Sequence, residues 1–113
     1  DSNVLILGFT FKENCPDVRN TKIVDIYHTL EEYTKNITVY DPWANADKVE
    51  HEYGVQLTSS SLESLKGKFN AVILAVAHKE FVSLDIRSFL KNENGVVYDV
   101  KGILDREMID GRL

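Results

Sequence analysis

Two lysines that follow apolar runs are the residues of this sequence best suited to chemistry with an anion. Lys12 follows the run VLILGF near the start, and Lys101 follows YDV near the end. A lysine at the carboxyl end of a strand can act as a point charge toward phosphate or donate to a sugar hydroxyl. If the first and last strands open onto one crevice, the two lysines face a common anion. The alternative, that Lys12 is a solvated loop lysine, remains open.

The segment around Lys12, GFTFKENCPDVRN at residues 8–20, is longer than the few residues that usually join a strand to a helix. Asp17 and Arg19 stand two apart, beside Pro16, so we expect them to pair and to hold the shape of the loop. Cys15 has no base nearby in sequence and no resolving cysteine. A nucleophilic role is therefore less favoured for it than that of an incidental small side chain.

Three more polar residues lie at the ends of apolar runs. Asp99 in YDVKG could orient Lys101 or the adjacent loop, and a purely structural role is an equal alternative. His78 in AVAHKEF could reach a ligand at the same edge of the sheet, although a capping or packing histidine is more common. Asp41 precedes Pro42, and Asp-Pro initiates turns, so we interpret it as a turn or capping residue.

Composition and charge exclude several classes of protein. The chain has 113 residues, 43% of them hydrophobic and 27% charged, which predicts one ordered domain over residues 1–113. A net charge of −5 disfavours nucleic acid or an acidic membrane as partner. No apolar run approaches the roughly 20 residues of a membrane span, and no signal peptide is expected. One cysteine and three scattered histidines predict no disulfide, no metal site and a reducing cytoplasm.

Short apolar runs alternate with segments of helical periodicity. The runs are rich in β-branched residues and nearly continuous, as in strands that are buried on both faces, and they occupy residues 4–8, 37–41, 55–57, 70–76 and 95–100. A helix is predicted over residues 21–36, with Asn36 taking a left-handed conformation at its end. We therefore predict the α/β class: a three-layer, Rossmann-like, doubly wound sheet of about five mainly parallel strands with flanking helices.

A dinucleotide fingerprint is missing at the end of the first predicted strand. A GxGxxG turn lets the backbone approach a pyrophosphate, but here only Gly8 is present, and Phe9, Thr10 and Phe11 follow it. The sequence thus predicts no NAD site in this chain. Phe9 and Trp43 are candidates for apolar side chains that are exposed when neighbouring domains are missing.

The residue sequences of four segments resemble a known family. GFTFKENCPDVRNTKIVDI, VYDP, NAVILAVAHKEF and VVYDVKGIL are similar to the C-terminal domain of the UDP-glucose/GDP-mannose dehydrogenase family, over essentially the whole chain. The resemblance is closest to the bacterial branch that acts on UDP-N-acetylhexosamines for capsule or O-antigen synthesis. It implies that an N-terminal NAD domain and a central helical region are absent from this chain.

The resemblance implies an activity and roles for residues. Family members oxidise the C6 alcohol of a nucleotide sugar to a carboxylate in two NAD-dependent steps, with NAD on the N-terminal domain. The catalytic cysteine and the homodimer interface belong to the central region, so no catalytic residue and no bound cofactor are expected here. By position, Phe11 and Lys12 would contact the UDP-sugar, with Asp17 and Arg19 shaping the loop. Lys101 stands where several relatives have arginine, which keeps the charge but loses the bidentate fork.

Two other functions are alternatives to this one. The chain could be an interdomain packing or oligomerisation module without ligand contact, in which case the strand-end lysines would be replaceable. A phosphoacceptor receiver domain has a similar size and alternation. That class needs acids at the ends of the first and third strands, where this chain has Gly8 with Phe9 and Leu57 with Thr58, so it is disfavoured.

Overall fold

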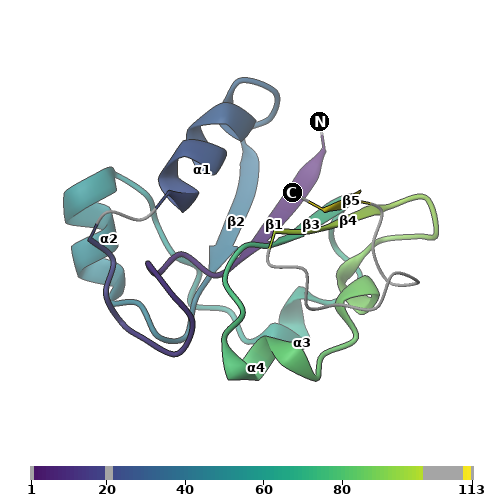
Figure 1. Cartoon of the computed structure of the whole chain (residues 1–113). Coiled ribbons are helices and arrows are strands. Elements are labelled where there is room, and N and C mark those ends of the chain that lie inside the picture. The colour runs from purple at the N-terminus through teal and green to yellow at the C-terminus, as the bar shows by residue number, and fades with distance from the viewer. Residues whose placement is uncertain (1, 20–21, 101–110, 113) are drawn as a thin grey trace.

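The computed structural model describes residues 2–19, 22–100 and 111–112. A wholly parallel sheet with the order β2-β1-β3-β4-β5 runs through the molecule (Figure 1). Its strands are β1 (Asn3–Leu7), β2 (Asn36–Tyr40), β3 (Ala71–Leu74), β4 (Val96–Asp99) and β5 (Gly111–Arg112). β1 and β3 each have a strand on both sides, and from Val4 to Leu7 and from Val72 to Leu74 every residue is buried. Burial on both faces explains the continuous apolar runs.

The helices are short, with four to nine residues each. They are α1 (Ile23–Glu31), α2 (Ala46–Tyr53), α3 (Leu62–Leu65), α4 (Lys79–Val82) and the 3-10 helix η1 (Ile86–Phe89). The Asn45 side chain accepts a hydrogen bond from the Lys48 amide at the start of α2, and Gly54 ends that helix at φ +69°. The prediction for Asn36 was wrong, because α1 ends at Glu31 and Asn36 opens β2.

Helices on both sides of the sheet bury two separate apolar cores. The core that includes Ile6, Ile73 and Val49 lies on the side of α1 and α2, whereas the core of Leu5, Leu74 and Phe89 contains residues from α3, α4 and η1. Figure 1 shows α1 on one side of the sheet and α3 with α4 on the other. The three-layer, doubly wound α/β class predicted from the sequence is thereby confirmed.

The predicted position of one strand needs a correction. Four of the five predicted runs form strands, but residues 55–57 do not. Leu57 makes only an isolated bridge to Val39, with the Thr58 amide donating to the Val39 carbonyl at 2.8 Å. This segment follows directly on the left-handed Gly54 and passes beside β2 for one bridge only, too briefly to form a ladder. A two-residue edge strand, β5, follows β4 instead.

The strand order fixes where a ligand can enter. The chain passes from β1 to its neighbour β2 on one side and then crosses β1 to reach β3 on the other side, so the winding direction reverses between β1 and β3. Sheets of the order 2-1-3-4-5 bind ligands beyond the carboxyl ends of the strands at this switch point. Within the described part of the chain, no helix is long and apolar enough to cross a membrane.

Candidate functional site

A pocket of about 220 Å³ lies at the switch point. It is lined by residues that follow β1, β3 and β4 and by the start of α1: Thr10, Phe11, Lys22, Ile23, Ile26, Ala75, Val76 and Val100. Phe11 is 54% exposed, which is unusual for so large an apolar side chain. An aromatic ring and a lysine on an otherwise apolar wall can bind a ligand that has both a ring and a negative charge.

Gly8 lets the chain leave β1 close to the end of β3. Its φ is +102°, a conformation that side-chain-bearing residues rarely adopt. An added Cβ would lie 2.6 Å from the Val76 Cβ and 2.8 Å from the Val76 backbone nitrogen. The Gly8 amide donates to the Tyr40 carbonyl at 2.8 Å. The residue at position 8 thus serves close packing of two loops.

Asp41, directly after β2, is the centre of a buried polar network. Its Oδ2 accepts from the amides of Phe9 (2.6 Å) and Thr10 (3.1 Å). His78 Nε2 lies 2.9 Å from the same oxygen. Oδ1 accepts from the amides of Trp43 (2.7 Å) and Ala44 (3.0 Å). One carboxylate therefore ties β2 to the loops that follow β1 and β3.

These bonds set the charge state of Asp41. Burial by itself raises the pKa of this carboxyl, but the hydrogen bonds from His78 and from the amides of Phe9 and Trp43 outweigh it, so the pKa lies below its ordinary value of 3.8. Asp41 is consequently an anion near neutral pH. The sequence identified it as a turn residue, and the Asp-Pro pair was the signal, but the sequence did not show that the turn is buried.

The network also answers whether the turn after β1 fits a dinucleotide. In a dinucleotide-binding turn, backbone amides remain available to the pyrophosphate. Here the amides of Phe9 and Thr10 are both bound to Asp41. The residues after β1 thus do not fit NAD. Among the described residues, no group of three or more histidine, cysteine, aspartate or glutamate side chains is placed to hold a metal ion.

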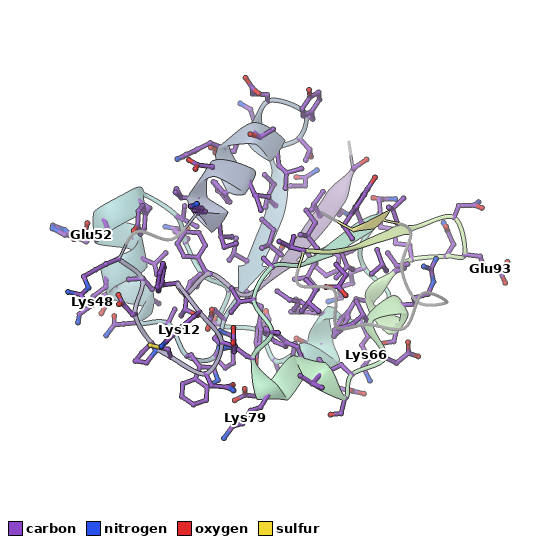
Figure 2. All side chains as sticks on the ribbon, viewed as in Figure 1. Lys12, Lys48, Glu52, Lys66, Lys79 and Glu93 are labelled. Carbon is purple, nitrogen blue, oxygen red and sulfur yellow. The ribbon has the colours of Figure 1, made fainter. Side chains whose placement is uncertain are left out.

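The predicted site residues fall into three groups. Phe11 lines the pocket, and Lys12 beside it is exposed on the loop, as Figure 2 shows. Asp17 and Arg19 form an exposed ion pair at 3.1 Å, and the Phe11 amide donates to the Asp17 carbonyl at 2.7 Å, which closes the loop. The hydrogen bonds from Arg19 lower the pKa of Asp17. Lys101 lies outside the described residues.

His78 and Asp99 are both fully buried. Asp99 is the last residue of β4, and both nitrogens of His78 are engaged within the protein. The prediction that Phe9 is exposed was wrong, since Phe9 is fully buried and packs edge-on against Tyr53 at 5.6 Å between ring centres, while Trp43 is half-buried. Lys22 also lines the pocket but was not among the predicted site residues. Its position directly before the amphipathic helix α1 could have indicated it.

Comparisons with known proteins agree with this geometry. Residues 5–106 match the model of the UDP-glucose/GDP-mannose dehydrogenase family, UDP binding domain. The chain is 45% identical to UDP-N-acetyl-D-glucosamine 6-dehydrogenase of Salmonella typhi, over 99% of this chain and 26% of that protein. It is 37% identical to Protein CapL of Staphylococcus aureus, over 96% of this chain and 25% of that protein. The chain thus spans about a quarter of the length of these relatives.

Solved structures show the same fold. The crystal structure of NDP-N-acetyl-D-galactosaminuronic acid dehydrogenase from Methanosarcina mazei superposes with a TM-score of 0.78 at 18% identity, over 98% of this chain and 24% of that one. At this identity the likeness concerns the fold alone. The family match, which covers nearly the whole chain, goes further: this chain belongs to the UDP-glucose/GDP-mannose dehydrogenase family, as its UDP binding domain.

Proposed function

We propose that this chain is the C-terminal, nucleotide-sugar-binding domain of an NAD-dependent UDP-sugar 6-dehydrogenase. The whole enzyme oxidises the sugar C6 alcohol to a uronic acid, and this domain forms one wall of the substrate site. The observation that carries the proposal is the pocket at the switch point, in a chain of this family, with Phe11 and Lys22 on its wall. The names of the relatives support a UDP-N-acetylhexosamine as substrate and a role in capsule synthesis. A role in O-antigen synthesis stays a prediction from the sequence motifs.

In this proposal, different residues at the pocket contact different parts of the ligand. Phe11 offers a flat apolar face, and Lys12 and Lys22 bring positive charge to the diphosphate. Lys101 follows Val100, a pocket residue, in the sequence, and we assign it to the same diphosphate. Asp17 and Arg19 keep the loop closed around Phe11.

The remaining chemistry is assigned to parts of the enzyme beyond this chain. NAD would bind an N-terminal domain, because the amides after β1 are occupied by Asp41. The catalytic nucleophile and the homodimer contact would lie in a central region, and the enzyme would work in the cytoplasm.

Mixed with NAD and a UDP-sugar, the 113-residue chain should therefore form no NADH. Clear turnover would contradict this division of labour.

The experiment that tests the site is a titration of the chain with UDP, followed by NMR. We expect shifts centred on Phe11, Lys12, Lys22 and Lys101. Lys12→Ala should weaken the response, whereas Lys91→Ala should not. Lys91 is a suitable control because it is exposed and lies in the loop before β4, at the opposite edge of the sheet. Shifts confined to another face would contradict the proposed site.

A packing module without ligand contact is the competing function. It predicts that Lys12→Ala in the whole enzyme leaves KM for the UDP-sugar unchanged, whereas our proposal predicts a higher KM. The exposed Phe11 and Val82 suit either function, so the kinetic measurement decides between them.

A further inference from the structure

His78 joins three segments that are far apart in the sequence. Its ring is fully buried and stacks on Trp43, with 5.9 Å between ring centres. Nε2 lies 2.9 Å from Asp41 Oδ2 and 3.1 Å from Thr10 Oγ1, and Nδ1 accepts from the Asn14 amide at 2.9 Å. One imidazole therefore contacts the end of β2 and two points of the loop at residues 8–19.

The surrounding donors allow only one arrangement of protons. Because Nδ1 accepts from the Asn14 amide, it carries no proton, so the proton of the neutral ring is on Nε2. Nε2 donates to the Asp41 carboxylate and lies within reach of Thr10 Oγ1. The Thr10 hydroxyl donates its own proton to the Lys12 carbonyl at 2.9 Å. His78 thus reaches the backbone of Lys12 through Thr10.

Asn14 completes the contact from the side of the loop. Its φ of +54° is the one positive value at a non-glycine residue in the described part of the chain. Asparagine tolerates this left-handed conformation better than most residues. While the Asn14 amide donates to His78, its Oδ1 accepts from the Lys79 amide at 2.8 Å, which satisfies a free donor at the start of α4.

We propose that His78 and Asn14 form a latch that positions Phe11 and Lys12 for the ligand. The loop is held on both sides of these two residues: at Thr10 through Asp41 and His78, and at Asn14 through His78 and Lys79. Neither latch residue is among those that line the pocket. The latch rests on the proposed function only for what Lys12 and Phe11 bind, since the contacts themselves are independent of it.

His78→Gln should keep the contact of the ring with Asp41 and remove its contact with Asn14. A glutamine amide can still donate toward Asp41, but it offers no acceptor at the Nδ1 position toward Asn14. We expect hydrogen exchange of the Asn14 amide to become about tenfold faster, and the UDP affinity to fall about fivefold, as for the loss of one ordinary hydrogen bond. His51→Gln on α2, where the side chain is exposed, is the matched control and should change neither quantity.

A pair of substitutions at Asn14 keeps the test valid if His78→Gln fails to fold. Asn14 is exposed, so its replacement spares the core. Asn14→Gly retains the left-handed conformation and the amide that binds His78, whereas Asn14→Ala disfavours the conformation as well. Both lose the side-chain bond to Lys79. The expected order of UDP affinity is wild type, then Asn14→Gly, then Asn14→Ala.

Imidazole ¹⁵N spectra give a readout that a general loss of stability would not produce. In the wild type, Nε2 of His78 should resonate as a protonated nitrogen and Nδ1 as an unprotonated acceptor. A protonated Nδ1, or unchanged exchange of the Asn14 amide in His78→Gln, would overturn the latch. If that variant loosens the loop but binds UDP as tightly as the wild type, positioning is wrong and the proposed function stands. If the wild type shows no shifts at Phe11 and Lys12, the proposed function fails while exchange still decides whether the latch exists.

Discussion

The carboxyl ends of the strands form one border of the sheet, here called the carboxyl edge, and their amino ends form the other, the amino edge. The polar residues described at these two edges differ in burial. At the carboxyl edge, Asp41 and His78 are buried and bonded to each other and to three loops. At the amino edge, a larger pocket of about 380 Å³ is lined by polar side chains such as Lys35 and Lys68, which are exposed. Figure 2 shows Lys12 and Glu93, which belong to the two edges, on opposite sides of the molecule.

Convergence of elements, rather than volume, distinguishes the proposed site from the amino-edge pocket. The smaller pocket is lined by the ends of β1, β3 and β4 and by the start of α1, and its loops are held by a buried network. At the amino-edge pocket the Asn3 amide donates to the Asn70 side chain at 2.8 Å, and the Asn3 side chain makes an exposed bond of 3.4 Å to the Lys68 carbonyl. A positioned site needs supporting contacts beneath it.

The largest effect is expected from Asp41→Ala, which removes the centre of the carboxyl-edge network. It would leave the amides of Phe9 and Trp43, among others, without their buried acceptor, at a cost of about 3–5 kcal/mol in the free energy of unfolding. Asn3→Ala at the amino edge should cost less than about 1 kcal/mol. Urea unfolding of both variants measures the contrast, and equal losses would contradict it.

Gly8→Ala should be the next most damaging change. The new Cβ would clash with the Val76 backbone and would also demand a φ of +102° from alanine, so we expect a loss of about 2–4 kcal/mol. Gly67→Ala is the control, because Gly67 also has a positive φ, +72°, but open space around it. That variant should lose about 1 kcal/mol, as judged by thermal or urea unfolding.

Lowering the pH should remove the stabilisation that the Asp41 carboxylate contributes at the carboxyl edge. The pKa of Asp41 is lower in the folded chain than its ordinary value of 3.8, so below that value the unfolded chain binds more protons than the folded chain. The stabilisation is complete above 3.8 and disappears as the pH falls through the folded value. Asp41→Asn should flatten this part of the stability-against-pH curve relative to the wild type, and an unchanged slope would contradict the role of the carboxylate.

The smallest effect on stability is expected at Lys12. Its side chain is exposed, so Lys12→Ala should change the free energy of unfolding by no more than about 0.5 kcal/mol, and Lys91→Ala should do the same. The two variants should differ only when UDP is added. A Lys12 variant that is strongly destabilised would mean that this lysine supports the loop itself.

Much of the fold and part of the site could be predicted from the sequence. The apolar runs at residues 4–8 and 70–76 indicate central strands, because strands that are covered on both faces are apolar throughout. Gly54, a residue suited to a helix C-cap, marks the end of α2. The motif around Phe11 and Lys12, in combination with VYDP, NAVILAVAHKEF and VVYDVKGIL, identified the family, because such motifs depend on residue types at close spacing.

Only the tertiary structure decided which strands are neighbours, and with them the network. Asp41 and His78 are 37 positions apart and meet because β2 and β3 flank β1 on either side. Whether a short apolar run joins the sheet was likewise decided in space, and residues 55–57 make a single bridge. The sequence by itself indicated most of the elements and, through its motifs, the family, since periodicity and motif spacing are local properties. Packing of distant segments decided which polar side chains are buried, and so which of them support the site rather than bind at it.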